Sequence, residues 1–391
     1  MAHHALVLNL HQPAGNLEHL LTHEPWEAEQ ILYAMDRIAR TLWQYEDVGR
    51  VHLSLSGTLL ETLSDPDFQE RVYGMVDCGS LLWHLQNDHI IRVLGTAYYH
   101  SVLPLIPEAD REEQLLRWRG IAGHLLWRDR FAGFWPPEMG FSMELIPLLQ
   151  RMGYRYVLVD SKHVQAVTPM DWPALRYRPH TARFGGHEIT VVVRDRDLSD
   201  AQESGMQFGW FQREVAERTR WCDFEPLVVT ATDGDNGGWF RNTSAGGSFW
   251  GEFWPEYMQQ ARSREATLRP TFVDDYLDRH GAWGEVTVDT GAWNTGWHNG
   301  EGFLQWTGSQ AQRDALKRVA DTSNAVHATR WQAGEHHVAD HFVWMALEDA
   351  MWHLLRAETS CHFFWGEDWL PRCHADLDLS WQALNRARSA L

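Results

Sequence analysis

The segment ALVLNLHQP, residues 5–13, carries the pattern that decides the fold. A short apolar run without strict alternation ends in the polar pair His11 and Gln12, and Pro13 follows. Runs this short and this apolar are typical of strands that are buried on both faces. Six further runs of the same kind follow along the chain, at residues 51–55, 90–94, 132–135, 155–159, 189–193 and 227–231.

Segments with a helical period separate these runs, at residues 27–43, 111–127, 143–152 and 209–219. Alternation of strands and helices predicts parallel βαβ units, and therefore a barrel or an open doubly wound sheet. Neither GxGxxG nor GxxxxGK[ST] occurs in the chain, so the commonest reason to prefer a nucleotide-binding open sheet is missing. The pattern favours a barrel.

The character of the chain changes after about residue 240. Residues 240–256 and 281–309 are rich in Gly and Trp, and we expect them to form long functional loops. Three stretches with helical character follow, at residues 311–326, 334–357 and 379–390. We therefore predict a catalytic barrel with long loops over residues 1–305 and a C-terminal helical domain over residues 306–391.

The composition narrows the class of partner. The 391 residues include 34 Lys and Arg against 53 Asp and Glu, a net charge of −19, which argues against nucleic acid and anionic membranes as partners. The 22 Trp residues suit a neutral ligand with flat apolar faces, such as a sugar. No apolar run reaches membrane-spanning length and no signal-peptide pattern opens the chain, so we expect a cytoplasmic protein. The four cysteines are scattered, and free thiols are expected.

Polar side chains follow the predicted strands at the ends where a parallel α/β fold places its site. Glu138 lies in a rigid turn after Pro136 and Pro137, where a long acid is a poor local cap, whereas Asp160 and Asp195 fit helix N-caps. Glycoside cleavage needs two carboxyl groups, a nucleophile or base and a proton donor, whose environments separate their pKa values. The strand ends therefore favour carbohydrate chemistry.

Several spaced blocks resemble glycoside hydrolase family 57, the family of α-amylase-like enzymes and α-glucanotransferases. The blocks are His11-Gln12-Pro13, Gly95 with Tyr99-His100 and Leu103-Pro104-Leu105, Phe134-Trp135-Pro136-Pro137-Glu138-Met139, and Thr232-Asp233-Gly234-Asp235-Asn236. Residues 193–200 and 290–294 are also similar to this family. The resemblance extends over nearly the whole chain and implies an incomplete (β/α)7 barrel with a C-terminal helical region.

The resemblance also implies roles for individual residues. Glu138 maps onto the nucleophile and Asp233 onto the general acid/base of a retaining reaction on α-glucosidic bonds, with α-1,4 bonds as the expected linkage; Asp235 is the rival acid/base. No metal and no other cofactor is expected for this chemistry. The expected substrate-binding residues are His11, Gln12, His100, Trp135, Asp235, Trp239, Trp293 and Trp365.

One block departs from the family pattern. The family often has Asn-Asp or Ser-Asp before an aromatic run, and here the run 360–365 has His362 where that Asp falls. This departure leaves open the choice between hydrolysis and transfer to another sugar, as in a 4-α-glucanotransferase or a branching enzyme.

Two other classes of protein remain open from the sequence. A metal-dependent hydrolase would use His11, His100 and Asp160, or the pair His337 and His341. A non-catalytic α-glucan-binding protein would keep the fold without needing a nucleophile.

Overall fold

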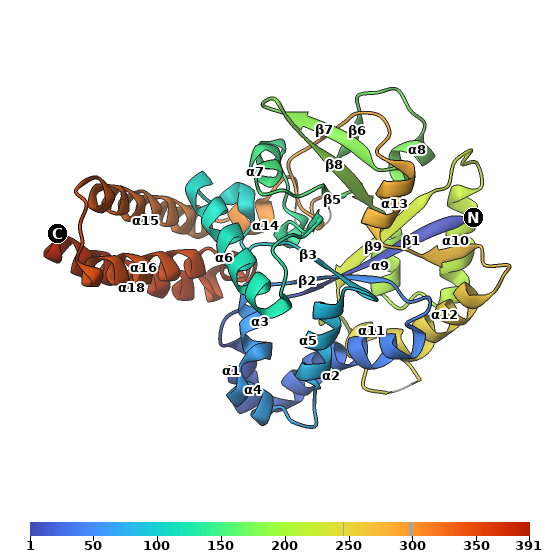
Figure 1. Cartoon of the computed structure of the whole chain (residues 1–391), viewed down its shortest axis with the longest axis horizontal. Helices are drawn as coiled ribbons and strands as arrows, with labels where there is room; N and C mark the ends of the chain where they lie inside the picture. Colours follow the sequence, from blue (N-terminus) through green and yellow to red (C-terminus); the bar gives the residue numbers. More distant parts are fainter. Residues whose placement is uncertain (245, 297–299) are drawn as a thin grey trace.

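Seven parallel strands form the framework of the protein in a computed structural model, which describes residues 1–244, 246–296 and 300–391 (Figure 1). Each of the seven apolar runs of the sequence forms one of them, so the strand predictions are confirmed. The strands are β1 (Ala2–Leu10), β2 (Val51–Leu55), β3 (Ile91–Leu94), β4 (Gly133–Phe134), β5 (Tyr156–Asp160), β8 (His187–Arg194) and β9 (Leu227–Asp233).

The strands follow one another around a barrel that is incomplete at two junctions. Parallel ladders join β9, β1, β2 and β3 on one side, and β4, β5 and β8 on the other. A single bridge between Gly95 and Phe134 joins β3 to β4. The backbone N–H of Asp195, just after β8, donates to Val229 O of β9 at 2.8 Å. The predicted incomplete (β/α)7 barrel is therefore confirmed.

Both faces of the barrel strands are buried, as their near-continuous apolar sequence predicts. Val7 and Val229 belong to one apolar cluster with Leu158 and Val192, whereas Leu6 and Leu8 pack in a second cluster with residues of the surrounding helices. The helices that precede or follow the strands are α1 (Asn16–His23), α2 (Pro25–Leu42), α3 (Gly57–Ser64), α4 (Pro66–Arg71), α5 (Cys78–Asn87), α6 (Glu108–Leu126), α7 (Ile146–Arg151), α8 (Trp172–Tyr177), α9 (Arg196–Glu203), α10 (Phe208–Thr219), α11 (Gly238–Arg241) and α13 (Val273–His280).

Among the described residues, four short strands lie outside the seven that the sequence predicts. β7 (His180–Phe184) pairs antiparallel with β8, and β10 (Leu268–Pro270) pairs with the start of β1. β6 (Val164–Ala166) and β11 (Val286–Val288) form a separate two-stranded sheet. β7 lies at the edge next to β8, and none of the four changes the order of the seven barrel strands.

The segment 240–256 is largely helical, which corrects the prediction of a long loop. A π-helical turn, η5 (Phe249–Phe253), leads into α12 (Trp254–Arg262). Phe249, Phe253 and Tyr257 recur at i, i+4 and i+8 and are fully buried, so the aromatic residues of this segment serve packing. Ala245 and residues 297–299 of the two predicted loops lie outside the described residues.

The C-terminal part is a group of helices that extends away from the barrel (Figure 1). Its elements are α14 (Leu304–Thr307), α15 (Gln310–Glu335), α16 (His341–Ala357), α17 (Ser360–Phe364) and α18 (Leu370–Ala390). It has its own apolar cluster, which includes Val319, Leu354 and Leu377. The division at residues 305 and 306 stays a prediction, and α14 crosses that position.

The predicted helix 334–357 is divided between two elements. α15 continues to Glu335, His337 has a left-handed backbone with φ 50°, and α16 begins only at His341. His337 and His341 therefore do not lie one turn apart on a helix, and the metal pair suggested by their spacing is not formed. All four cysteines are free, as expected. In the described ranges, no helix is both long enough and apolar enough to cross a membrane.

Candidate active site

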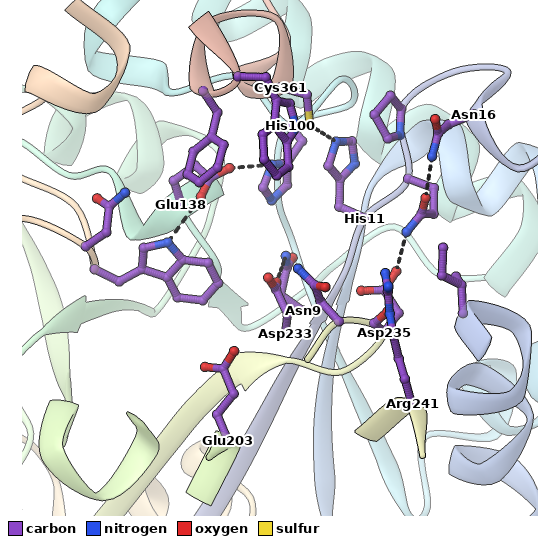
Figure 2. Close-up of a pocket in the computed structure, with 18 of the residues that line it drawn as sticks. Asn9, His11, Asn16, His100, Glu138, Glu203, Asp233, Asp235, Arg241 and Cys361 are labelled. Carbon is purple, nitrogen blue, oxygen red and sulfur yellow. Dashed lines mark hydrogen bonds and ion pairs between the residues drawn. The ribbon is translucent and has the colours of Figure 1, made fainter. Parts of the chain in front are cut away.

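A cavity of about 740 Å³ opens at the carboxyl ends of β1, β4 and β9 (Figure 2). Its size lies within the range of small-molecule sites. Barrel residues and residues of the C-terminal helices both line it. The lining includes Asn9, His11, Gln12, His100, Glu138, Glu203, Asp233, Asp235, Trp293, Cys361, Phe364, Trp365 and Trp369.

Glu138 lies in a tight turn directly after β4 and has a left-handed backbone, with φ 58° and ψ 15°. The next residue, Met139, has φ 49°. Such conformations are costly for residues with a Cβ and persist only where the surroundings impose them. The backbone N–H of Trp293 donates to Glu138 O at 3.1 Å, and Met139 N–H donates to Pro136 O at 2.7 Å. The turn thus aims the Glu138 side chain into the cavity.

Two donors from distant segments bind the Glu138 carboxylate. Ser360 Oγ donates to Oε1 at 2.8 Å, and the indole N–H of Trp293 donates to Oε2 at 3.1 Å. His100 Nδ1 lies 3.7 Å from Oε1. Burial raises the pKa of Glu138, and the two hydrogen bonds oppose that rise because they stabilise the charged form. Ser360 had no assigned role in the sequence, although it is the first residue of the run 360–365 that departs from the family pattern.

Asp233 approaches the same space from the end of β9 (Figure 2). Burial, and next the negative charge of Asp235, hold the pKa of Asp233 well above its usual range. One hydrogen bond opposes this effect, from Asn9 Nδ2 to Asp233 Oδ1 at 3.0 Å. Asp233 therefore tends to keep its proton.

Asp235 is held by a short chain of amide side chains. Gln12 Nε2 donates to Asp235 Oδ2 at 3.0 Å, and Asn16 Nδ2 donates to Gln12 Oε1 at 2.9 Å. Burial raises the pKa of Asp235 to about 6. Both Gln12 and Asp235 line the cavity, and their contact with substrate stays a prediction.

His11 and His100 stack face to face, with ring centroids 4.1 Å apart and an interplanar angle of 9°. Burial lowers the pKa of His11 well below its usual range and that of His100 to about 3, so both rings are neutral. Within the part of the chain that the structure describes, His11 Nδ1 and His100 Nε2 are buried without a hydrogen-bond partner. A neutral imidazole can donate at one nitrogen and accept at the other, and both rings line the cavity.

The four predicted stacking tryptophans have different environments. Trp293 and Trp365 line the cavity, and Trp365 is 57% exposed. Trp135 is fully buried and packs edge-on against Trp293, at a centroid distance of 5.4 Å, so it offers no face to a sugar. Trp239 is half-buried, packs against the core and is not among the described residues that line the cavity. The prediction that Trp135 binds substrate is therefore wrong, whereas the same role for Trp239 stays a prediction.

The C-terminal helices complete the cavity through α17. Ser101 forms a bridge with Thr359, and Ser360 N–H donates to His100 O at 3.2 Å. Cys361 then faces the cavity, with Sγ 3.5 Å from His11 Nε2. Burial raises the pKa of Cys361 to about 12, so the thiol stays protonated.

His362, which the sequence places where the family's Asp falls, is buried away from the cavity. Its Nδ1 lies 3.3 Å from Ala357 O, within the helical region. Cys361 is the residue of this block that faces the site, together with Phe364 and Trp365. Trp369 also lines this wall and carried no signal in the sequence.

Asp160 is not placed to bind a metal with His11 and His100. It is fully buried and accepts hydrogen bonds from Arg194 Nη1 and Arg196 Nε, each at 2.8 Å. Asp195 caps α9 by accepting from Leu198 N–H at 3.1 Å, as expected for an N-cap. Glu203, also on α9, lines the cavity and accepts a hydrogen bond from Thr232 Oγ1 at 2.7 Å. No sequence motif marks Glu203, because it lies within an ordinary helix.

Comparison with known proteins identifies the family. The family model for glycosyl hydrolase family 57 matches residues 5–289. The chain belongs to glycosyl hydrolase family 57. This match covers the strands and turns that carry Glu138 and Asp233.

The curated relatives are much longer than this chain. An α-amylase of Pyrococcus horikoshii is 25% identical over 194 residues, which are 48% of this chain and 27% of that protein. Alpha-amylase 1 of Dictyoglomus thermophilum is 20% identical over 302 residues, 74% of this chain and 39% of that protein. The chain thus spans between a quarter and two fifths of the length of these relatives.

Solved structures share the fold over the whole chain. A 4-α-glucanotransferase from Thermococcus litoralis matches with a TM-score of 0.72 and 18% identity, covering 100% of this chain and 60% of that one. A GH57 branching enzyme from Thermococcus kodakaraensis matches with a TM-score of 0.73 and 14% identity, covering 99% of this chain and 89% of that one. The C-terminal helices, which lie outside the family model, are included in these matches.

The environment of Asp233 predicts how stability depends on pH. Above the ordinary pKa of an aspartate, the folded chain still holds the Asp233 proton while the unfolded chain has released it. The unfolded state then binds fewer protons, so the free energy of unfolding falls as pH rises through this window. The variant Asp233→Asn has no carboxyl group at this position and does not show this fall in the free energy of unfolding. The free energy of unfolding of Asp233→Asn, minus that of the wild type, is therefore expected to be greater at pH 8 than at pH 4.

Urea unfolding at the two pH values measures this difference. Asp129→Asn, which replaces an exposed carboxyl group, controls for the loss of one negative charge. A stability difference between Asp233→Asn and wild type that is independent of pH would contradict the raised pKa of Asp233.

Proposed function

We propose that the protein is a retaining glycoside hydrolase that cleaves α-glucosidic bonds of α-glucans or maltooligosaccharides, with α-1,4 bonds as the expected linkage. The observation that carries this proposal is the pair of acids in one cavity, Glu138 and Asp233, with different surroundings. Burial raises the pKa of both acids, but two donors oppose this rise at Glu138, whereas the charge of Asp235 adds to it at Asp233. These are the protonation states that a nucleophile and a general acid need.

In the first step, Glu138 attacks the anomeric carbon and forms a glycosyl ester. Asp233 donates its proton to the glycosidic oxygen as the C–O bond breaks, so the remainder of the chain leaves as an alcohol. His11 and His100, which line the cavity, bind hydroxyl groups of the ring. Ser360 and Trp293 hold the carboxylate of Glu138 in position for the attack.

In the second step, Asp233, now ionised, takes a proton from the incoming acceptor. The acceptor oxygen attacks the anomeric carbon, the ester bond to Glu138 breaks, and the configuration of the substrate is kept. A water molecule as acceptor gives hydrolysis, and the hydroxyl group of a second glucan gives transfer. Asp233 recovers its proton in either case.

Transfer to a second glucan, by a 4-α-glucanotransferase or branching-type reaction, is the alternative outcome of the same chemistry. Phe364, Trp365 and Trp369 form an aromatic wall of the cavity, and Trp365 and Trp369 lie 6.3 Å apart between ring centroids. Aromatic rings that line a cavity in this way can bind the apolar faces of sugars. An acceptor glucan held there would compete with water.

A non-catalytic α-glucan-binding protein and a metal-dependent hydrolase, the two other classes left open by the sequence, have less support. The strained turn at Glu138 and its two donors favour catalysis over binding alone, because a protein that only binds glucan has no need to position a nucleophile. The two arginine contacts of Asp160 disfavour a catalytic metal held with His11 and His100. Cytoplasmic residence stays an expectation.

The direct test replaces the nucleophile. Glu138→Gln is expected to lower kcat on maltooligosaccharides at least about a thousandfold, because the neutral amide cannot form the glycosyl ester. Release of reducing sugar measures turnover, and calorimetry with maltoheptaose measures binding, which is expected to persist. Glu24→Gln, at another carboxyl group that lines the cavity, is the matched control and is expected to keep turnover within a few-fold of wild type. Turnover by Glu138→Gln close to that of Glu24→Gln would exclude Glu138 as nucleophile.

Removing the Ser360 hydroxyl tests its hydrogen bond to Glu138. Without this donor the charged form of Glu138 is less stable, so its pKa rises and the protonated, inactive form persists to higher pH. The acidic limb of the pH profile of kcat/KM is therefore expected to shift toward higher pH in Ser360→Ala. Ser360→Thr keeps a hydroxyl group and is expected to restore the limb. An unchanged acidic limb in Ser360→Ala would show that this hydrogen bond does not govern the nucleophile.

A further inference from the structure

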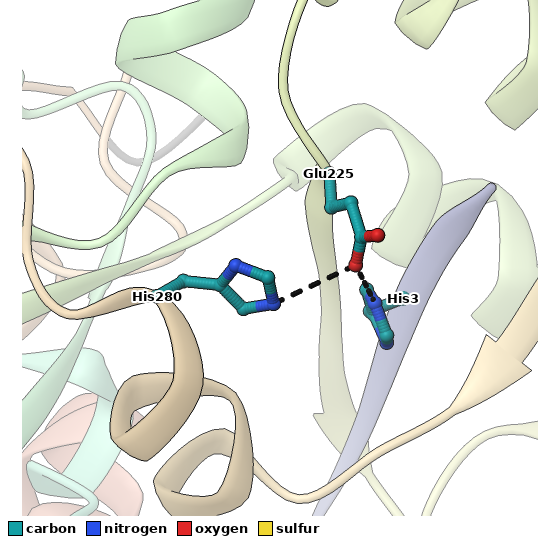
Figure 3. Close-up of side chains that lie close together, drawn as sticks. All are labelled: His3, Glu225 and His280. Atoms are coloured by element: carbon teal, nitrogen blue, oxygen red, sulfur yellow. Dashed lines mark hydrogen bonds and ion pairs between the residues drawn. The ribbon is translucent and has the colours of Figure 1, made fainter.

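We propose that His3, Glu225 and His280 form a binding site for a divalent transition-metal ion, with zinc as the best fit, at the end of the barrel opposite the cavity (Figure 3). Each residue offers one ligand atom, and the three atoms lie within 4.8 Å of one another. His3 Nε2 is 2.8 Å and His280 Nε2 is 3.6 Å from the same atom, Glu225 Oε2. Figure 3 shows both imidazole rings directed at that carboxylate.

The donor set and spacing fit a zinc ion. Two imidazole nitrogens and one carboxylate oxygen are a common zinc set, and a fourth position remains for water. Tetrahedral zinc with ligands at about 2.0–2.2 Å places neighbouring donor atoms about 3.3 Å apart. The two separations from Glu225 Oε2 lie on either side of this value, so small side-chain rotations are enough to admit the ion. Among the described residues, this is the one cluster of three His, Cys, Asp or Glu ligand atoms with such spacing.

Three segments that are distant in sequence supply the ligands. His3 is buried near the start of β1, Glu225 precedes β9, and His280 is the last residue of α13. Tyr276 orders this arrangement, because its hydroxyl donates to Glu225 O at 2.5 Å and its ring lies 4.4 Å from that of His280. The His3 ring packs against the edge of the same tyrosine at 5.5 Å.

The site is open to solvent on one side. The side chains of Glu225 and His280 are 52% and 31% exposed, whereas that of His3 is 6% exposed. An ion can therefore enter from solvent and bind against a buried, fixed imidazole. Neighbouring groups that fix a ligand in this way raise metal affinity.

The position of the site indicates a structural role. His3 and Asn9 lie near opposite ends of β1, six residues apart, which corresponds to about 20 Å. Asn9 contacts Asp233 in the cavity, so a metal at His3 lies far from the reacting groups. A bound ion would tie β1, the entry to β9 and the end of α13 together, and would stabilise the fold by mass action.

Zinc titration of the protein purified without a polyhistidine tag and stripped with a chelator tests the proposal. One zinc ion per chain, with Kd at or below the micromolar range, is expected by calorimetry and by metal analysis after gel filtration. Tm is expected to rise with zinc concentration, while turnover of glucan is the same in the stripped and the loaded protein. His280→Ala and Glu225→Gln, at two exposed ligands, are each expected to weaken zinc binding at least tenfold.

His19→Ala is the matched control. His19 is exposed and pairs with His23 at a centroid distance of 4.5 Å, away from the proposed ligands, so this variant is expected to bind zinc as wild type does. Absence of stoichiometric zinc in the wild type, or equal zinc affinity in the wild type, His280→Ala and Glu225→Gln, would overturn the proposal. The cluster would then be a hydrogen-bonded group only. Loss of glucan turnover on stripping would contradict the structural role.

Discussion

The site depends on the cost of burying the Glu138 carboxylate. A buried charge without partners is strongly destabilising, and the groups that compensate Glu138 come from distant parts of the chain. Ser360 belongs to the C-terminal helices, and Trp293 belongs to the segment between β11 and α14. Trp293 contacts Glu138 through both its backbone and its indole N–H, which holds a strained turn in place. The barrel therefore supplies Glu138 itself, whereas segments outside the barrel strands supply the hydrogen-bond donors that stabilise its carboxylate.

The two acids differ because their neighbours differ. Glu138 receives two hydrogen bonds and has a histidine nearby, whereas Asp233 receives one and lies near a second aspartate. Burial raises the pKa of both acids, so burial alone does not distinguish them. The number of hydrogen-bond donors and the charge of Asp235 distinguish Glu138 from Asp233, and both favour a proton on Asp233. The neutral, stacked rings of His11 and His100 add no positive charge that would ionise it.

Much of the fold was predictable from the sequence, because strands buried on both faces leave an apolar signature that needs no knowledge of partners. The strand ends placed Glu138, Asp233, Asp235, His11, Gln12 and His100 in one cavity. What was missed depends on tertiary packing. Composition cannot distinguish a stacking tryptophan from one that packs in the core, such as Trp135, or one that donates a hydrogen bond, such as Trp293. The orientation of α17 decides that Cys361, and not His362, faces the site.

The central claim is that Glu138 forms a covalent bond to the sugar. A fluorinated α-glucosyl fluoride that forms the glycosyl ester faster than it is hydrolysed would trap this intermediate, and mass spectrometry of a digest would locate it. The account predicts one added sugar on the peptide that contains Glu138, both in the wild type and in the control Asp129→Asn. It predicts no added sugar in Glu138→Gln. A sugar attached to a different acid, or products released with inverted configuration and no adduct, would contradict it.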